Sequence, residues 1–276
     1  MPEGPEIRLA ADRVAKAVVG RPLAAVSFAF EQLQPFEEPL TDARVLAVDT
    51  RGKAMLTRFS CSLTVYSHNQ LYGRWMVGRA EPPPKTTRSL RFAMIGHTKA
   101  ARLYSASSID VVPTDEIEQD PRIAKLGPDA LDLDVTPVEL LGRLQSKTFK
   151  NRQLGGLLLD QRFVAGLGNY LRSDILNGAR VHPSMRPRDL DPGALERIAT
   201  LTLGLTRRSY KTRGVTNDDA RVAALKDAGA SRRDYRHLAY GRARRRCYVC
   251  ESVIERMEHG GRAVFVCPTC QPTTTT

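Results

Sequence analysis

The stretch "CYVCESVIERMEHGGRAVFVCPTC", residues 247–270, decides how the C-terminal part of the chain folds. Each of its two C-x-x-C pairs turns two sulfurs toward one point, and the 16 residues between the pairs can form a β-hairpin that brings them together. This spacing favours one structural zinc ion per chain, with a closed set of four thiolate ligands. The ligands are Cys247, Cys250, Cys267 and Cys270. Two disulfides are the alternative, which a reducing compartment disfavours.

The region before the hairpin is strongly basic. The chain of 276 residues has a net charge of +12, and residues 207–246 hold 13 Lys or Arg against 4 Asp or Glu. A basic excess of this size indicates a polyanionic partner, most often nucleic acid. Residues 213–240 are predicted to be a basic linker or loop that is either solvated or in contact with phosphate. No apolar run reaches the roughly 20 residues needed to cross a bilayer. The N-terminus has no pattern of a secretory signal, so we expect no membrane association and a cytoplasmic location.

Helical signals fill the middle of the chain. Thr136-Pro137-Val138-Glu139 has the form of a capping box, and Asp191-Pro192 has the form of another helix start. Residues 154–163 and 170–179 are predicted helices, and the glycine-rich "VAGLGN" (164–169) separates them.

The N-terminal half begins with a helix and continues with strands. Apolar residues recur at helical spacing from Pro5 to Val19. Seven short β-like runs follow between residues 25 and 107, which predicts antiparallel sheets packed face to face. "TRGK" (50–53) reads as a tight hairpin turn that carries Lys53. Cys61 falls within an apolar run and is expected to be a buried core thiol.

The opening "MPEGPE" offers unusual chemistry. Removal of the initiator methionine would expose the secondary amine of Pro2, and an α-amino group titrates at about 7.7–8.0. Such an amine can attack a sugar's anomeric carbon and form an iminium, which is an electron sink for elimination. Glu3 could supply a proton, and Glu6, one turn on, could assist or could complement the helix N-terminus. A frayed, inert tip is the alternative.

Five segments together resemble the family of formamidopyrimidine-DNA glycosylase and endonuclease VIII, the bacterial glycosylases that excise oxidised bases. They are "MPEGPEIRLAADRV", "TRGKAML", "YSHNQLYG" (66–73), "LLLDQRFVAGLGNYLRSDIL" (157–176) and "CYVC…CPTC". "MPEGPEIRLAAD" and "SHNQLYG" look more like the endonuclease VIII branch, which acts mainly on oxidised pyrimidines.

The resemblance implies an α+β multidomain protein. An N-terminal catalytic antiparallel β-sandwich flanked by helices is expected over residues 1–131. A helical DNA-binding domain with a helix-two-turn-helix unit would follow over 132–212, then the basic linker or loop (213–240) and a zinc-ribbon β-hairpin (241–271). Residues 272–276 are expected to be a disordered tail.

The resemblance also implies roles for particular residues. Pro2 would form a Schiff base with the deoxyribose, and Glu3 would be the proton donor when the glycosidic bond is cleaved. Lys53 would bind phosphate and donate a proton in β-elimination, and Arg262, after the "HGG" turn, would clamp a phosphate and donate in δ-elimination. An exposed hairpin-tip lysine without a role is the alternative for Lys53.

Further residues are expected to contact DNA. Gln70, Leu71 and Tyr72 match residues that fill the gap left by the extruded nucleotide, although Leu71 and Tyr72 could instead belong to the sheet core. Asn169 would donate to phosphate, cap its own helix, or do both. Lys125 would make a basic phosphate contact at a position where the family pattern has arginine.

The sequence therefore predicts a bifunctional DNA glycosylase and abasic-site lyase of base excision repair. It would act as a monomer on damaged double-stranded DNA, excise oxidised pyrimidines, and cut the strand by β,δ-elimination in the bacterial cytoplasm, associated with the nucleoid. The alternatives are a purine-directed formamidopyrimidine/8-oxoguanine glycosylase, a non-catalytic zinc-ribbon DNA-binding protein, and an RNA-binding translation factor.

Overall fold

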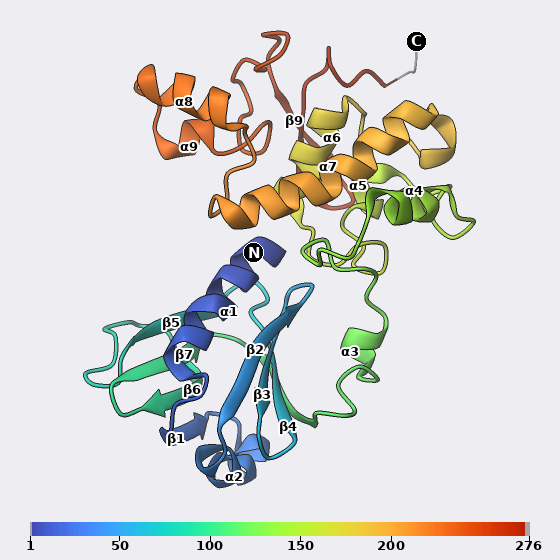
Figure 1. Cartoon of the computed structure of the whole chain (residues 1–276). Helices are drawn as coiled ribbons and strands as arrows, with labels where there is room; N and C mark the ends of the chain where they lie inside the picture. Colours follow the sequence, from blue (N-terminus) through green and yellow to red (C-terminus); the bar gives the residue numbers. More distant parts are fainter. Residues whose placement is uncertain (1, 274–276) are drawn as a thin grey trace. The chain divides into compact units, whose positions relative to one another are not determined.

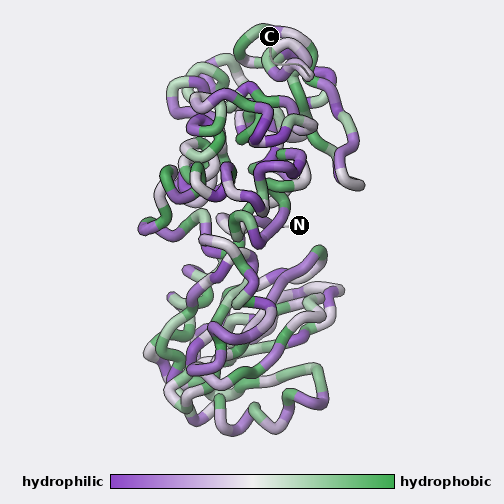
Figure 2. Tube along the Cα trace, turned by 90° about the vertical axis from the view of Figure 1, so that its right-hand side faces the viewer, coloured by the Kyte–Doolittle hydropathy of each residue, from purple (hydrophilic) through white to green (hydrophobic). Residues whose placement is uncertain are grey.

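The chain divides into two compact units, Met1–Lys125 and Leu126–Thr276, and the structure, a computed structural model, describes residues 2–273. The sequence placed the division after residue 131, and the structure places it after Lys125. Part of the predicted disordered tail, residues 274–276, lies outside the described residues. None of the helices in residues 2–273 is long and apolar enough to span a membrane, and hydrophilic stretches interrupt the hydrophobic ones along the chain (Figure 2).

The first unit is a sandwich of two four-stranded antiparallel sheets with the orders β1-β6-β7-β5 and β2-β3-β4-β8. Helix α1 (Gly4–Val18) precedes the strands and packs against members of both sheets (Figure 1). The strands are β1 (Leu23–Phe28), β2 (Val45–Arg51), β3 (Ala54–Phe59), β4 (Leu63–His68), β5 (Arg74–Arg79), β6 (Leu90–Gly96), β7 (Lys99–Tyr104) and β8 (Ser108–Pro113). The predicted first helix and antiparallel sandwich are confirmed.

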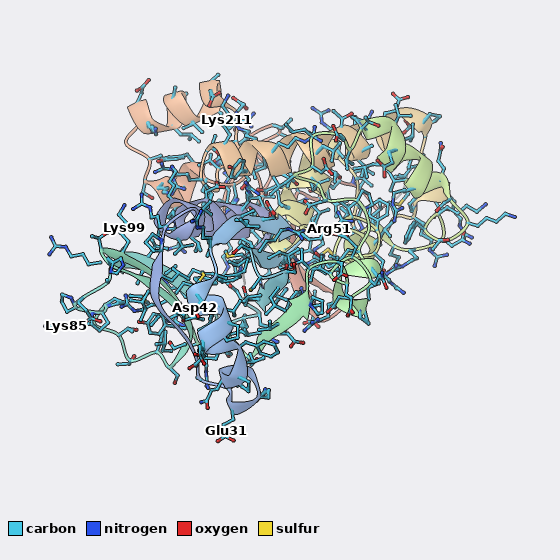
Figure 3. All side chains as sticks on the ribbon, turned by 60° about the horizontal axis from the view of Figure 1, so that its bottom comes forward. Glu31, Asp42, Arg51, Lys85, Lys99 and Lys211 are labelled. Carbon is cyan, nitrogen blue, oxygen red and sulfur yellow. The ribbon has the colours of Figure 1, made fainter. Side chains whose placement is uncertain are left out.

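One apolar core holds this unit together. Alternate residues of β6, such as Phe92 and Met94, face this core, and α1 presents Ile7, Val14 and Val18 to it. The rings of Phe28 and Phe92 stack with centroids 4.7 Å apart, which joins two neighbouring strands of one sheet. The charged side chains of Glu31, Lys85 and Lys99 lie outside this core (Figure 3).

Three features of this unit differ from the sequence prediction. Strand β8 was not predicted, nor were the 3-10 helix (Glu31–Phe36) and α2 (Glu37–Asp42) that cover the sheet end after β1. Cys61 is not a buried core thiol: it is exposed, in the turn between β3 and β4. The apolar run that contains it is two strands of a hairpin, and the turn places this thiol in solvent. A short helix, α3 (Pro121–Ala124), ends the unit.

The second unit is helical and ends in a two-stranded hairpin. Its helices are α4 (Pro137–Gln145), α5 (Leu154–Leu157), α6 (Asn169–Ala179), a 3-10 turn (Pro187–Asp189), α7 (Pro192–Lys211), α8 (Asp219–Asp227) and α9 (Arg232–Tyr235). Strands β9 (Glu255–His259) and β10 (Arg262–Val266) form the hairpin. Helix α7 packs on both α4 and α6, and β10 packs on α6 (Figure 1).

Side-chain caps start the helices where the sequence predicted them. The Thr136 hydroxyl accepts from the Glu139 N–H at 3.2 Å, and the Asp191 carboxylate accepts from the Ala194 N–H at 2.8 Å. The predicted helix over 154–163 is shorter, because α5 ends at Leu157.

Residues 213–240 are not simply a linker, because they contain α8 and α9. The Asp218 carboxylate caps α8, and Ser231 and Asp234 form a capping box on α9. None of the residues of α8 or α9 is fully buried, so the sequence carries no apolar periodicity that would reveal these helices.

Candidate functional site

The beginning of α1 holds Glu3 in a fixed, enclosed position. Glu3 is the N-cap residue of the helix and only 3% of its surface is exposed. Its N–H donates to the Glu6 carboxylate at 3.0 Å, and its own carboxylate accepts from the Glu6 N–H, which completes a capping box. Pro2, next to it, is half-buried. The tip is therefore ordered, and the Glu6 carboxylate is used in the structure of the helix start.

Lys53 lies in the hairpin between β2 and β3, both of which contact α1. Gly52 forms the turn with a φ of +59°, a conformation that a residue with a Cβ rarely adopts. Burial lowers the pKa of the His68 imidazole, and the positive charge of Lys53 lowers it further. His68 Nδ1 accepts from the Gln70 N–H at 3.0 Å, which leaves Nε2 to carry the ring proton. A neutral imidazole therefore lies beside the Lys53 ammonium.

The loop after β4 presents Leu71 and Tyr72 to solvent. Leu71 is 54% exposed and Tyr72 is 69% exposed, so neither belongs to the sheet core. Two adjacent apolar side chains exposed on one loop form a contiguous patch, and such patches mark interaction sites. This arrangement has the form of a wedge that can enter a gap in a base stack.

Several bonds hold this loop rigid. Gln70 has a φ of +51°, and its side-chain oxygen accepts from the Ser107 hydroxyl. The Gly73 N–H donates to Asn69 O at 2.7 Å, and a Cβ on Gly73 would lie only 2.4 Å from that oxygen. Arg88 donates to Tyr72 O at 2.7 Å. The wedge side chains are thus exposed on a fixed backbone.

In the second unit, Asn169 joins the start of α6 to the hairpin. Its side-chain amide donates to Ala263 O at 2.9 Å, next to Arg262 in strand β10. Gly168, and not Asn169, is the N-cap residue of α6, so the expectation that Asn169 caps its own helix is wrong. Gly166 has a φ of +97°, which glycine alone adopts readily, and this turn delivers the chain to the helix start.

Arg172 fixes this junction from inside the unit, because its side chain is fully buried. Its guanidinium donates to Gly155 O and to Ala263 O, both at 2.9 Å, and to the Asn169 side-chain oxygen. A charged group buried with several acceptors holds them in one geometry. The α6 N-terminus and the hairpin therefore form one rigid element.

The two remaining basic candidates are exposed. Arg262 follows a two-residue turn in which Gly260 and Gly261 have φ values of +60° and +72°, the form of a type I′ hairpin turn. Lys125 is exposed directly after α3. Lys125 belongs to the first unit, and Arg262 and Asn169 belong to the second.

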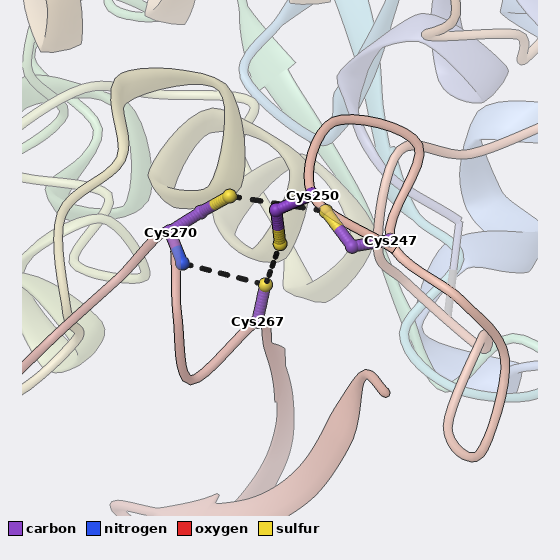
Figure 4. Close-up of side chains that lie close together, drawn as sticks. All are labelled: Cys247, Cys250, Cys267 and Cys270. Carbon is purple, nitrogen blue, oxygen red and sulfur yellow. Dashed lines mark hydrogen bonds between the residues drawn. The ribbon is translucent and has the colours of Figure 1, made fainter. Parts of the chain in front are cut away.

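The four C-terminal cysteines form a cluster with the geometry of a metal site (Figure 4). Their sulfurs all lie within 4.8 Å of one another, with Cys250 and Cys267 at 3.3 Å and Cys247 and Cys270 at 4.0 Å. Tetrahedral zinc with bonds of about 2.3 Å requires sulfurs about 3.8 Å apart. The Cys270 N–H also points at Cys267 Sγ at 3.4 Å, as expected of a turn that stabilises a thiolate. The cluster can hold a metal ion.

The electrostatics of the cluster favour a cation. A hydrogen bond from the Ser252 side chain lowers the pKa of Cys250 to about 6, whereas burial raises the pKa values of Cys267 and Cys270. One thiolate therefore forms readily, but adding further negative charge within a few ångströms is unfavourable. A divalent ion removes this conflict by compensating the charge.

Known proteins resemble this chain over nearly its whole length. The family model of the formamidopyrimidine-DNA glycosylase N-terminal domain matches residues 1–104, and that of the formamidopyrimidine-DNA glycosylase H2TH domain matches residues 126–218. Endonuclease 8 of Klebsiella pneumoniae is 44% identical over 98% of this chain and 100% of its own, and Endonuclease 8 of Salmonella schwarzengrund is 43% identical with the same coverage.

Solved structures share the fold. Lactococcus lactis Fpg (MutM), in complex with DNA containing an oxidised pyrimidine, matches with a TM-score of 0.81 and 19% identity over 99% of this chain and 100% of its own. MutM in complex with DNA containing carbocyclic 8-oxo-G matches with a TM-score of 0.80 and 18% identity, again over 99% and 100% of the two chains.

Sequence reasoning missed several residues that shape these sites. His68 stands inside the quoted motif "YSHNQLYG", yet only its contact with Gln70 and Lys53 gives it a role. Arg172 likewise lies within the helical stretch, and nothing in the spacing shows that it is buried. Ser107 and Arg88 lie far from the motif in sequence and could be found only in the folded chain.

Proposed function

The chain belongs to the formamidopyrimidine-DNA glycosylase family, and on that premise we propose that it is a DNA glycosylase and abasic-site lyase of base excision repair that excises oxidised pyrimidines. The observation that carries the proposal is the ordered tip, in which buried Glu3 is held at the N-cap of α1 beside half-buried Pro2. The high identity to proteins named Endonuclease 8 supports the pyrimidine branch.

In this proposal the nitrogen of Pro2, freed of Met1, attacks C1′ of the damaged nucleotide. The glycosidic bond breaks as the new N–C1′ bond forms, Glu3 supplies the proton during base release, and the Pro2 nitrogen loses its own proton. The C1′–O4′ bond of the sugar then opens, O4′ takes up a proton, and an iminium joins the ring-opened sugar to the protein. The iminium withdraws electrons, so a proton leaves C2′ and the 3′ C–O bond breaks in β-elimination. Loss of the 5′ phosphate by δ-elimination completes the cut, and water then releases the sugar fragment.

Basic and amide side chains of each unit would bind phosphate, and Lys53 and Arg262 would also move protons. Lys53 and the neutral His68 beside it offer an ammonium and an N–H donor to a phosphate near the lesion. Asn169 has a second amide hydrogen besides the one that binds Ala263 O. Arg262, after the hairpin turn, has a planar guanidinium group that can donate two hydrogen bonds to one phosphate. Lys125 would add a further phosphate contact.

The wedge residues would lower the free-energy cost of rotating the lesion out of the duplex. Rotating a nucleotide out of the duplex costs a few kcal/mol, and Leu71 and Tyr72 can recover part of this by filling the vacated space. Gln70, held by the hydrogen bond from Ser107, would help to fill the same space.

The metal in this proposal is zinc, held by Cys247, Cys250, Cys267 and Cys270. With four thiolate ligands the ion has no open position for substrate, so its contribution is to fold the hairpin that carries Arg262. We place the protein in the cytoplasm as a monomer bound to damaged DNA.

A lesion panel tests the proposal. Duplexes that carry thymine glycol, dihydrouracil or 8-oxoguanine are incubated with the protein, and incision is followed with and without borohydride. We expect the pyrimidine lesions to be cut faster and a covalent adduct to accumulate with borohydride. A preference for 8-oxoguanine would assign the purine branch, and binding without any adduct would identify a non-catalytic DNA-binding protein.

A further inference from the structure

A basic pocket in the second unit plays no part in the chemistry above. Its volume is about 400 Å³, and it is lined by Arg232, Arg233, Arg236, His237, Tyr240 and Gly241, none of which is acidic. It includes α9, shown in orange in Figure 1, within the segment that the sequence predicted to be a linker.

The floor of this pocket is fixed from behind by a buried carboxylate. Asp174 is fully buried and accepts from the Ala239 and Tyr240 N–H groups at 2.8 and 2.9 Å. Its other oxygen lies 2.6 Å from the Thr216 hydroxyl and 3.2 Å from His237 Nδ1. The segment that carries His237 and Tyr240 is therefore tied to α6, and the protein's own hydrogen bonds fix this side of the pocket.

Within residues 2–273 no carboxylate pairs with Arg232 or Arg233, so the positive charge of these two side chains is not neutralised. Arg233 is exposed and makes no hydrogen bond or ion pair within residues 2–273, and Arg232 donates to a neutral carbonyl, Arg213 O. The neighbouring carboxylate of Asp234 is used elsewhere: it binds Ser231 and Arg245. The hydrogen bond from Ser231 lowers the pKa of Asp234 to about 2, so it remains an anion in that arrangement.

The spacing of the arginines concentrates this charge on one side. Arg232 is the first residue of α9 and Arg236 is its C-cap, so two positive charges lie four residues apart, a spacing at which like charges repel. Arg236 is also held in place, because its Nε donates to Gly214 O at 2.7 Å and its guanidinium lies over the Tyr170 ring. An anion between the guanidinium groups would turn the repulsion into charge-assisted hydrogen bonds.

We propose that this pocket is a phosphate subsite in which Arg232 and Arg233 bind one phosphodiester of a DNA strand outside the lesion. This inference rests on the proposed function, because it takes DNA as the ligand. A phosphodiester suits the pocket since it is an anion with two free oxygens, and planar guanidinium groups bind such a pair in bidentate fashion. Residues 231–246 carry seven arginines and one aspartate, so the surroundings also favour a polyanion.

The first test measures binding of undamaged duplex as a function of salt. We compare the wild-type chain with R232A/R233A, R232K/R233K and the control R21A, which removes an exposed arginine of the other unit. R232A/R233A should bind about 10-fold more weakly, and the slope of log affinity against log salt should fall by about 0.9, the value for one phosphate. R232K/R233K should keep the slope, and R21A should match the wild type. An unchanged slope in R232A/R233A would overturn the inference.

The second test locates the phosphate. Single methylphosphonate groups, which are neutral, are placed one at a time along the duplex. At one methylphosphonate position the wild type should bind the modified duplex more weakly than the unmodified one, whereas R232A/R233A should bind both equally. The absence of such a position would contradict the proposal. If inorganic pyrophosphate binds the wild type but DNA affinity does not depend on Arg232 and Arg233, the pocket takes a small anion and the proposal is wrong.

Folding and function are separated by further readouts. Zinc content and the melting temperature of R232A/R233A should equal those of the wild type. Borohydride trapping on preformed abasic DNA at low salt reports the proposed function alone: the wild type and the double variant should both form the adduct. If neither chain forms the adduct, the proposed lyase activity is refuted. If the double variant forms the adduct normally and its DNA binding has the same salt dependence as that of the wild type, only the phosphate subsite is refuted.

Discussion

Replacing Asp174 by alanine should destabilise the second unit strongly. The carboxylate is fully buried and has four hydrogen-bond partners, two of them backbone N–H groups. Removing one member of a buried charged network costs about 3–5 kcal/mol, because the groups left behind are desolvated and unpaired. Asp174→Asn keeps the shape and an acceptor for both N–H groups, so it should cost about 1–2 kcal/mol.

The measurement is urea unfolding at pH 7, followed by far-UV circular dichroism, together with amide exchange at Ala239 and Tyr240. Burial alone would raise the pKa of Asp174, but hydrogen bonds from His237, Thr216 and the Ala239 N–H outweigh it and hold the pKa below the ordinary 3.8. This contribution to stability is therefore present above about pH 4 and is lost as the pH falls through the lower native value. A loss below about 1 kcal/mol in Asp174→Ala would refute the reasoning.

Three further perturbations address the candidate sites. Gly73→Ala should lower incision of lesions in duplex DNA by about 10-fold but leave cutting of single-stranded abasic DNA unchanged. The reason is that the new Cβ would lie 2.4 Å from Asn69 O and displace the loop that carries Leu71 and Tyr72. Equal effects on both substrates would contradict this. Glu3→Gln should lose base release and retain cutting of preformed abasic sites, as gel assays on the two substrates can show; normal base release would exclude Glu3 as the proton donor. Chelation should release one zinc ion per chain, measured by a colorimetric zinc assay, and should weaken binding of duplex DNA, measured by fluorescence anisotropy. Undiminished DNA binding by the metal-free protein would argue against a structural ion.

The sequence was most informative where the pattern is local. The apolar spacing after Pro5 and the caps at Thr136 and Asp191 depend on neighbours within one turn, and the structure has helices at all three places. The cysteine spacing predicted a cluster for the same reason, because each C-x-x-C turn is short and the hairpin between them closes the set.

Features that depend on tertiary contacts could not be predicted. Cys61 has apolar neighbours on both sides, yet the hairpin turn exposes it. Helices α8 and α9 have no fully buried residue and so no apolar stripe to detect. The support of Gln70 by Ser107 joins residues 37 apart in sequence, and the burial of Asp174 depends on backbone groups more than 60 residues away. The pocket at Arg232 and Arg233 depends on the contacts of Asp174, because they fix the segment that carries His237 and Tyr240.

The most direct test of the central claim is to locate the covalent bond. Abasic DNA is trapped on the protein with borohydride, nuclease and protease digestion follow, and mass spectrometry identifies the modified peptide. We predict a reduced sugar remnant on the Pro2 nitrogen of a chain that has lost Met1, and no adduct with a variant whose N-terminus is extended. A remnant on Lys53 or another lysine, or undiminished strand cutting by the extended variant, would contradict the account.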